Sequence, residues 1–398
     1  MGLSPAAREA MNPPQIMIVA GEASGDHHAA RLVAALQEMI PGARFCGIGG
    51  DHLAAQGVRL LRHASDLAVV GLMEVGQHLP AIFGALREVA RTLRQSRPDL
   101  VILVDFPDFN FWVARLARFY GAPVMYYISP QVWAWRTYRV RTLKRLVARL
   151  AVIFPFEAEF YQARGLAVDY VGHPLLETLP PTPDRQNWLA QWGLAPNLLT
   201  IALLPGSRGS EIARHLPAML AAARLVQQAV PETQFVLPLA STAPRKLVQG
   251  MVKGESLDTS GLRLELIPGQ SYQALCAAHV AVAASGSATL EAALAGVPTV
   301  IVYRLSPLTF ALGRRLIRVP HVGMANLLAG ERLFPELLQD DFTPARLAQE
   351  VLGWLQNGRR LASLRQGLAR ILTRLGGPGA SRRAALVALE LLRGQHVR

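Results

Sequence analysis

The feature of this sequence that most constrains its fold is a unit that recurs along nearly the whole chain. Each unit is a short apolar run, then a turn rich in Gly, Ser and Asp, then a longer segment whose apolar residues have helical spacing. Repetition of such units predicts parallel strands joined by helices, which is an α/β fold. We predict strands in the first half at residues 15–20, 44–47, 99–104, 123–128, 150–154 and 168–171, and in the second half at 199–204, 234–239, 263–267, 280–284 and 299–303.

Two series of strands in 398 residues indicate two doubly wound, Rossmann-like domains. Residues 179–197 contain four prolines that interrupt both periodicities, so we expect a hinge there. Ligands of doubly wound folds bind at the carboxyl ends of the strands, and we expect the domains to face a central cleft. The expected organisation is an extension at 1–14, a first domain at 15–178, the hinge at 179–197, a second domain at 198–358, and helices at 359–398 that pack back on the first domain.

The charge of the chain favours anionic partners. Its 41 Lys and Arg residues against 28 Asp and Glu give a formal net charge of +13. A positive field attracts phosphorylated substrates, anionic lipid surfaces and nucleic acid alike, and a genomic bias toward arginine is an alternative source of the excess. The sequence contains no recognisable RNA-binding module, so we expect no nucleic-acid partner.

The cysteines and the lengths of the apolar runs indicate in which cellular compartment the protein resides. Cys46 and Cys276 lie far apart, which argues against a disulfide framework or a Cys-based metal site and fits a reducing cytoplasm. Residues 1–14 lack the apolar core of a signal peptide. No run reaches the roughly 18 apolar residues of a membrane span, so we expect any membrane contact to be peripheral.

Two loops in the first half follow predicted strands and carry polar residues. Residues 21–26, Gly-Glu-Ala-Ser-Gly-Asp, open a helix, where glycines and free N–H groups suit an anion such as a sugar phosphate. The alternative is a tight turn with Asp26 as the helix cap. Residues 105–110 place Asp105 and Asp108 after another strand, where a carboxylate can accept the proton of a sugar hydroxyl. The alternative is that both carboxylates cap the next helix.

Two loops in the second half offer donors for a diphosphate. Residues 205–211 contain Gly206 and Arg208 at a helix start, and the arginine can bind phosphate oxygens with two parallel N–H groups. An ordinary surface turn is the alternative. Residues 284–291 place small hydroxyl residues at another helix start, with Glu291 about one turn in, which suits phosphate and ribose hydroxyls. Here the alternative is a plain capping box at Ser287.

Several motifs are absent, which narrows the chemistry. The sequence has no D-x-D metal–diphosphate motif, no H-E-x-x-H and no G-x-S-x-G. The ten histidines are scattered, and His173 is explained equally well as a hinge residue or a catalyst. We therefore expect no metal and no cofactor, with Arg208 and helix N-termini neutralising a departing diphosphate.

Together and in order, these loops resemble lipid-A-disaccharide synthase across nearly the whole chain. The resemblance implies a GT-B fold and the transfer of a sugar, with inversion, from UDP-2,3-diacylglucosamine to 2,3-diacylglucosamine 1-phosphate (lipid X). The products would be the β-1,6-linked disaccharide 1-phosphate and UDP. The resemblance rests on residues 21–26, 105–110, 129–136 (Ser-Pro-Gln-Val-Trp-Ala-Trp-Arg), 172–174 (Gly-His-Pro), 205–211, 285–291 and 326–330 (Asn-Leu-Leu-Ala-Gly).

The resemblance also implies roles for individual residues. Asp108 would be the base that deprotonates the acceptor's 6-hydroxyl, with another carboxylate left open, and Arg208 would stabilise the departing UDP. Ala325 stands beside Asn326 where the family usually has proline, which is a departure in that loop. The implied donor-binding residues are Gly206, Ser207, Arg208, Gln270, Ser285, Gly286, Ser287, Ala288, Thr289, Glu291 and Asn326, and the implied acceptor-binding residues are Gly21, Glu22, Ser24, Gly25, Asp26, Met73, Glu74 and Trp133.

The resemblance gives a role to two further regions. Residues 66–83 are strongly apolar and suit acyl chains at a membrane surface, or else form ordinary core. The basic run at 136–149 beside Trp133 and Trp135 suits lipid headgroups or the acceptor phosphate, or else forms a solvated face. The implied protein is cytoplasmic and associates peripherally with the anionic inner membrane, and a homodimer is left open.

Two rival functions stay open from the sequence. Another UDP-sugar enzyme of the GT-B fold, an epimerase or a peptidoglycan glycosyltransferase, would share the fold and the donor site. A non-catalytic basic protein that binds membranes or RNA would leave the carboxylates of residues 105–110 unexplained.

Overall fold

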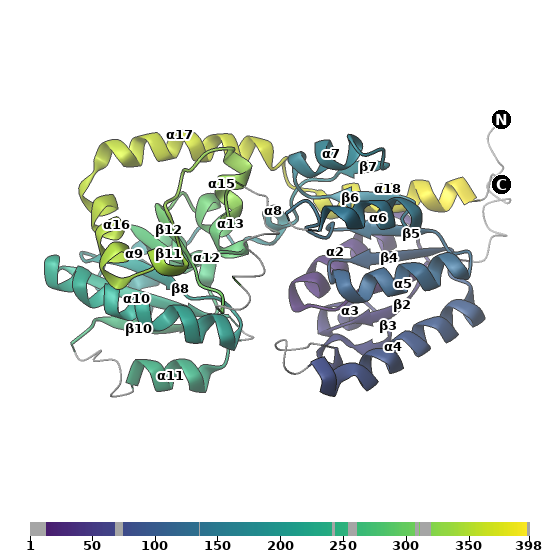
Figure 1. Ribbon diagram of the computed structural model, residues 1–398, viewed down its shortest axis with the longest axis horizontal. Coiled ribbons are helices and arrows are strands. Elements are labelled where there is room, and N and C mark those ends of the chain that lie inside the picture. Colours follow the sequence, from purple (N-terminus) through teal and green to yellow (C-terminus); the bar gives the residue numbers. More distant parts are fainter. Residues whose placement is uncertain are drawn as a thin grey trace. The chain divides into compact units, whose positions relative to one another are not determined.

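The computed structural model describes residues 13–67, 75–134, 136–240, 243–253, 261–306, 310 and 320–395. The chain divides into two compact units (Figure 1). The first unit is residues 1–177 together with 375–398, and the second unit is residues 178–374. Each unit contains one parallel sheet, so the predicted α/β fold with two doubly wound halves is confirmed.

The first unit has a seven-stranded parallel sheet in the order β3-β2-β1-β4-β5-β6-β7 among the described residues. Its central strands are apolar at every position because helices cover both faces, as parallel sheets require. The strands are β1 (Gln15–Ala20), β2 (Arg44–Gly49), β3 (Arg59–His63), β4 (Leu100–Val104), β5 (Val124–Tyr127), β6 (Arg149–Val152) and β7 (Val168–Tyr170).

Helices α2 and α18 pack on one face of this sheet, and α4 and α5 pack on the other (Figure 1). Alternate strand residues therefore point to opposite layers. The helices are α2 (Ala23–Met39), α3 (Asp51–Ala55), α4 (Val75–Ser96), α5 (Pro107–Phe119), α6 (Val140–Leu146), α7 (Pro155–Gln162), α8 (Leu175–Thr178) and α18 (Ala380–Gln395), with short 3-10 turns η1 (Ala64–Asp66) and η2 (Thr137–Arg139).

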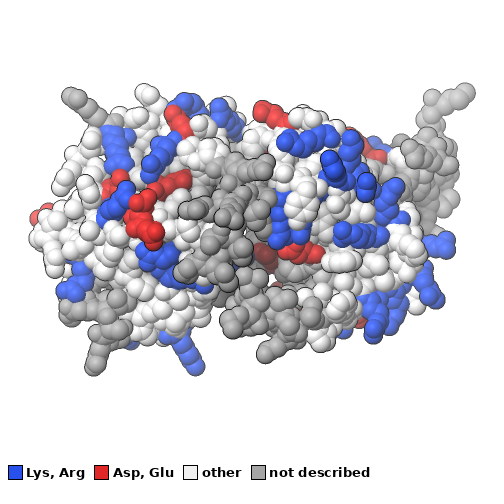
Figure 2. Space-filling view, viewed as in Figure 1, with Lys and Arg blue, Asp and Glu red and all other residues white. Residues whose placement is uncertain are grey.

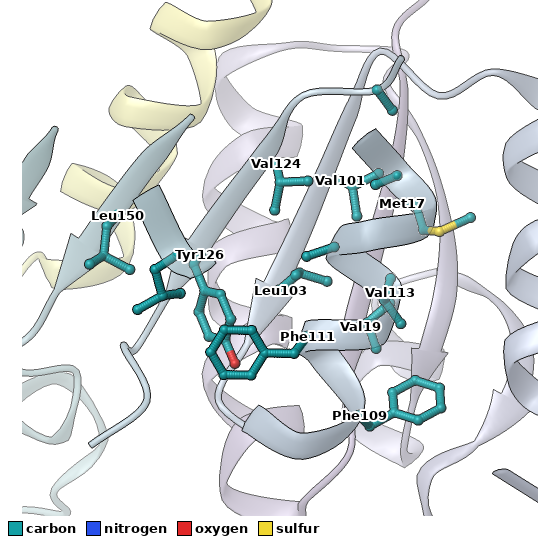
Figure 3. Close-up of a cluster of buried hydrophobic side chains, with 14 of the residues drawn as sticks. Met17, Val19, Val101, Leu103, Phe109, Phe111, Val113, Val124, Tyr126 and Leu150 are labelled. Carbon is teal, nitrogen blue, oxygen red and sulfur yellow. The ribbon is translucent and has the colours of Figure 1, made fainter. Parts of the chain in front are cut away.

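The core between the sheet and α5 shows this alternation directly (Figure 3). Met17 and Val19 of β1 and Val101 and Leu103 of β4 are fully buried on the face that meets Phe111 of α5. Burial of such side chains contributes about 1.5–3 kcal/mol each relative to exposure, so this layer fixes α5 and the loop that precedes it.

The second unit has a six-stranded parallel sheet in the order β10-β9-β8-β11-β12-β13 among the described residues. Helices α10 and α16 pack together on one side, and α9, α12 and α13 lie over the other. The strands are β8 (Leu199–Leu204), β9 (Thr233–Leu239), β10 (Leu264–Pro268), β11 (Val280–Ala284), β12 (Thr299–Tyr303) and β13 (Glu336–Leu338). The helices are α9 (Arg185–Gln191), α10 (Gly209–Ala229), α11 (Arg245–Lys253), α12 (Ser271–Ala277), α13 (Ser287–Leu294), α15 (Met324–Ala329), α16 (Pro344–Gln356) and α17 (Gly358–Arg374), with the 3-10 turn η3 (Gln339–Asp341).

Two expected boundaries need correction. Helix α17 contacts α13, α15 and α16, so the chain returns to the first unit at Leu375 and not at residue 359. Of the expected C-terminal helices, α18 belongs to the first unit and α17 to the second. The proline-rich segment 179–197 belongs to the second unit, because Trp188 and Leu189 of α9 are buried in its core.

The strand orders place a topological switch point in each sheet. In the first unit the order reverses between the neighbouring strands β1 and β4, and in the second between β8 and β11. Loops that leave the carboxyl ends of two such strands run in opposite directions and open a crevice, where doubly wound folds bind ligands. The loops at these points are residues 21–26 and 105–110 in the first unit, and 205–211 and 285–291 in the second.

Candidate active site

The two switch-point loops of the first unit touch each other. A Cβ at Gly21 would lie 2.1 Å from Cδ1 of Phe106, so only glycine lets the two loops approach this closely. Glu22 is half-buried, Ser24 is exposed and Gly25 is buried, so this loop presents a mixture of side chain and backbone.

Asp26 is buried beneath this loop, with only 3% of its surface exposed. Its carboxylate accepts hydrogen bonds from the backbone N–H groups of Gly50 (2.6 Å), His52 (3.0 Å) and Leu53 (3.3 Å). It therefore caps α3, a different helix from its own, and holds the loop after β2. This placement makes Asp26 a support of the predicted acceptor loop and not part of its exposed surface.

The loop after β4 begins with two strained residues. Asp105 and Phe106 both have φ of 47°, in the left-handed region that side chains disfavour. The Asp105 carbonyl accepts hydrogen bonds from Asn110 Nδ2 (2.6 Å) and from the Tyr126 hydroxyl (2.7 Å). Such strain persists only where the surroundings fix it, and it is typical of functional loops.

Asp108 follows this strained turn at the start of α5, with a side chain that is 72% exposed. Its Oδ1 accepts hydrogen bonds from Arg136 Nη1 (3.0 Å) and Arg139 Nη1 (2.7 Å). The Arg139 guanidinium also lies 5.2 Å from the ring centroid of Phe111. The predicted base is thus held by two arginines from the loop and turn that follow β5.

The loop after β5 is anchored by a carboxylate that sequence reasoning missed. Glu157 of α7 is 1% exposed and accepts hydrogen bonds from Ser129 Oγ (2.8 Å) and Trp133 Nε1 (3.0 Å). Burial raises the pKa of Glu157 to about 7, against hydrogen bonds that favour its ionised form. Trp133 is itself buried, so this predicted acceptor residue faces α7.

Four histidines that looked scattered in the sequence lie near the loop of residues 21–26. The ring centroid of His27 lies 6.0 Å from that of His28 and 4.9 Å from that of His52. Burial lowers the pKa of His28 to about 4 and that of His173 to about 3. His173 Nδ1 accepts the N–H of Leu175 (3.1 Å), so at neutral pH these buried rings are uncharged structural groups.

In the second unit, the loop after β8 presents Arg208 at the start of α10, with a side chain that is 63% exposed. Glu211 lies beneath the loop and accepts the N–H groups of Ser207 (3.2 Å) and Arg208 (3.4 Å). Gly206 has φ of 117°, and a Cβ there would lie 2.6 Å from Glu211 Oε2. Glycine is therefore required for the loop to close over Glu211.

His215, which sequence reasoning also missed, anchors this loop from below. It is fully buried on α10, and its Nδ1 lies 2.8 Å from the carbonyl oxygen of Pro205, which can only accept. Its Nε2 accepts the backbone N–H of Arg304 (3.0 Å). These two contacts require the neutral ring with its proton on Nδ1, and burial lowers the pKa of His215 in agreement.

The loop after β11 is the second loop at the switch point of this sheet. Gly286 and Ser287 are exposed at the start of α13, Ala288 is half-buried and Thr289 is buried. The Ser285 hydroxyl donates to the Val322 carbonyl (2.8 Å). Burial raises the pKa of Glu291 to about 7.

Two predicted donor residues have side chains that are bonded within the second unit. Gln270 is left-handed (φ 55°), and its Oε1 accepts the indole N–H of Trp188 (2.7 Å). Asn326 is fully buried and exchanges hydrogen bonds with the backbone of Phe334 while also donating to Glu336. Both side chains therefore stabilise loops, and Asn326 has no exposed surface.

Two of the predicted acceptor-binding residues, Met73 and Glu74, lie outside the described residues. Within the described ranges, no three His, Cys, Asp or Glu side chains are grouped to hold a metal ion, and no helix is both long and apolar enough to cross a membrane.

The family comparison covers almost the entire chain. A family described as lipid-A-disaccharide synthetase matches residues 16–391. Lipid-A-disaccharide synthase of Syntrophus aciditrophicus is 45% identical over 383 residues, which is 96% of this chain and 99% of that protein. The enzyme of the same name from Myxococcus xanthus is 46% identical over 382 residues, covering 96% and 98% of the two chains.

Solved structures with low sequence identity share the fold. A UDP-GlcNAc 2-epimerase from Neisseria meningitidis superposes with a TM-score of 0.67 at 14% identity, covering 94% of this chain and all of that one. MurG of Acinetobacter baumannii gives a TM-score of 0.57 at 18% identity, covering 95% of this chain and all of that one. These neighbours establish the GT-B fold, and the sequence match over residues 16–391 establishes that the chain belongs to the lipid-A-disaccharide synthetase family.

Proposed function

We propose that this protein transfers the sugar of UDP-2,3-diacylglucosamine to the 6-hydroxyl of lipid X, with inversion at the anomeric carbon. The observation that carries the proposal is the position of Asp108 and Arg208. Each stands in a loop at the switch point of its own sheet, one as an acid group and one as an obligate cation. Inverting transfer needs both a base for the acceptor and a cation for the leaving diphosphate.

The acceptor side of the reaction falls to the first unit. Both arginine contacts of Asp108 use Oδ1, and we assign the proton transfer to Oδ2. The acceptor hydroxyl gives its proton to Oδ2 while its oxygen forms the new bond to the anomeric carbon. In the same step the bond from that carbon to the diphosphate breaks, on the opposite face of the sugar.

The donor side falls to the second unit. The charge that develops on UDP is stabilised by Arg208 and by the N–H groups that open α10 and α13, since helix N-termini favour anions. The carboxyl group of Glu291, one turn into α13, accepts ribose hydroxyls. Ser285, Gln270 and Asn326 hold the surrounding loops through the bonds described above.

The test is Asp108→Asn, assayed with both acylated sugars by mass spectrometry of the disaccharide and by UDP release. Loss of a general base lowers the rate by about 100- to 10,000-fold, while UDP affinity measured by calorimetry is unchanged. Glu159→Gln, an exposed carboxyl group on α7, is the control and retains full activity. Full activity of Asp108→Asn would show that Asp108 is not the base. Failure of the wild-type protein to release UDP would contradict the proposed reaction.

We further propose that the first unit contacts the anionic cytoplasmic face of the inner membrane, where acylated substrates reside. Helices α4 and α5 pack together and expose Phe83 (63%), Trp112 (56%) and Phe119 (79%). Lys and Arg side chains gather on the same unit (Figure 2), and aromatic rings with cations suit an anionic lipid interface. The exposed basic residues of α4, α5 and α6 are Arg87, Arg91, Arg94, Arg115, Arg118, Arg141, Lys144 and Arg145.

Cosedimentation with vesicles tests this surface. A protein with Trp112→Ser and Phe119→Ser binds phosphatidylglycerol vesicles about tenfold more weakly, since each buried ring contributes of order 1 kcal/mol or more. A matched control is Leu225→Ser with Leu247→Ser, which removes exposed apolar side chains from the second unit. Equal loss of binding in both proteins, or in neither, contradicts the assignment.

A further inference from the structure

The loop that carries Arg136 is strained at its start and anchored on a single helix. Ile128, the residue after β5, is β-branched yet has φ of 60°. The next residues bond to α7: the Ser129 hydroxyl lies 2.8 Å from Glu157 Oε1, and the Tyr161 hydroxyl donates to the Pro130 carbonyl (2.9 Å). A strained backbone of this kind is kept only by such surrounding contacts.

Glu157 uses its two oxygens for two different purposes. Oε2 accepts the N–H groups of Ile153 and Phe154 (both 3.2 Å), which caps the start of its own helix. Oε1 accepts Ser129 and Trp133, which belong to the loop after β5. The capping function is local to α7, whereas the Oε1 contacts reach a loop 24 to 28 residues earlier in the chain.

The anchored loop leads directly to Asp108. The N–H of Arg136 donates to the Val132 carbonyl (3.1 Å), so its position is set by the turn that contains Trp133. The N–H of Arg139 donates in turn to the Arg136 carbonyl (2.9 Å). Both guanidinium groups then bind Asp108 Oδ1. A continuous series of contacts thus joins Glu157 Oε1 to the carboxyl group of Asp108.

We propose that Glu157 is a positioning residue that, through Trp133 and Arg136, sets the orientation of the Asp108 carboxyl group for proton transfer. This inference rests on the proposed function of Asp108. It assigns to Glu157 no contact with substrate. Its effect is on the catalytic step, because a carboxyl group turned away from the acceptor hydroxyl lowers the rate without changing how the donor binds.

The experiment uses Trp133→Phe, which removes one donor to Oε1 but keeps the ring against Phe156 and the Oε2 cap of α7. We expect kcat to fall about tenfold, the size expected when a hydrogen bond to a buried charged group is lost, with the donor KM unchanged. Trp354→Phe in the second unit is the matched control, because its buried Nε1 has no hydrogen-bond partner among the described residues. The control retains wild-type kcat.

A double-mutant cycle then separates positioning from general destabilisation. In a background that carries both Arg136→Ala and Arg139→Ala, Trp133→Phe lowers kcat by less than about twofold, because both guanidinium contacts to Asp108 are already removed. A tenfold loss in both backgrounds, or an unchanged kcat in Trp133→Phe alone, overturns the inference. Disaccharide synthesis by the wild type and the effect of Asp108→Asn are read in the same assay, so failure of the proposed function is recognised separately.

Discussion

The two units hold loops of the candidate site with buried groups of different character. In the first unit, Glu157 accepts four hydrogen bonds and lies behind a loop that carries arginines. In the second, His215 gives one hydrogen bond and accepts one, and it contacts the backbone of the Pro205 loop directly. A buried acid suits a basic loop, whereas a neutral ring adds no charge beside the proposed diphosphate site.

The same fold thus positions the proposed base and the proposed cation by different physical means. The proposed cation has a rigid backbone and a local partner, since Arg208 projects from a helix start closed over Glu211 and its Nη1 lies 3.6 Å from Glu211 Oε1. The proposed base depends on side chains from elsewhere in the chain, since the Asp108 carboxyl group is held by guanidinium groups from another loop. Substitutions of Arg208, His215 and Glu157 test this difference between the two units.

The largest effect is expected from Arg208→Ala. Removal of a charge that stabilises the transition state lowers kcat/KM by about 100- to 1,000-fold, while stability changes little because the side chain is 63% exposed. Steady-state kinetics and thermal unfolding measure the two quantities. Arg214→Ala, an exposed arginine farther along α10, should behave as the wild type; a matching loss there would mean that general charge, and not the position of Arg208, sets the rate.

A smaller effect is expected from His215→Phe. The change leaves the Pro205 carbonyl and the Arg304 N–H without their partner, which costs about 3 kcal/mol for two buried polar groups. We expect UDP affinity, measured by calorimetry, to fall with the loosened loop, and the free energy of unfolding to fall in urea. If UDP affinity stayed unchanged while stability fell, His215 would support the core alone.

The smallest expected effect is on the pH dependence of stability, which has opposite signs for Glu157 and His215. The pKa of Glu157 is raised from 4.5 to about 7, so its contribution to stability is complete below 4.5 and is lost as pH rises through 7, by about 1 kcal/mol between pH 6 and pH 8. The pKa of His215 is lowered from 6.5, so its contribution is present above 6.5 and is lost as pH falls.

Urea unfolding of the wild type, Glu157→Gln and His215→Phe at pH 5, 6 and 8 resolves the two contributions. Glu157→Gln should remove the loss on the alkaline side, and His215→Phe should remove part of the loss on the acid side. A single pH profile shared by all three proteins would show that neither anchor changes its protonation between folded and unfolded chains.

Most strands could be predicted because parallel strands buried on both faces are unbroken apolar runs, as in Leu100–Val104. The two that were missed lack that signal. Strand β3 (Arg59–His63) is an edge strand with charged ends, and β13 has only three residues. The switch-point loops were predicted for the same reason as the strands, since each loop directly follows an apolar run.

The roles of Glu157 and His215 were harder to predict from the sequence than the strands and loops. An acid such as Glu157 in the first turn of a helix is ordinary on electrostatic grounds, and only the tertiary fold brings Ser129 and Trp133 to it. His215 did leave a signal, because it lies on the helix face shared with Ile212 and Met219, where a polar residue needs a partner. The buried bonds of Asp26 likewise depend on a loop that begins 24 residues later in the sequence.

The division of the chain has a consequence for synthesis on the ribosome. The first unit needs α18, whose Ala380, Ala384 and Ala388 are fully buried and whose contacts are with α2, β4 and β6. That helix emerges only after the whole second unit, on the order of ten seconds or more later at about 5–20 residues per second. The contiguous second unit is therefore complete first, and the unit that carries Asp108 acquires its last layer only after the second unit has been synthesised.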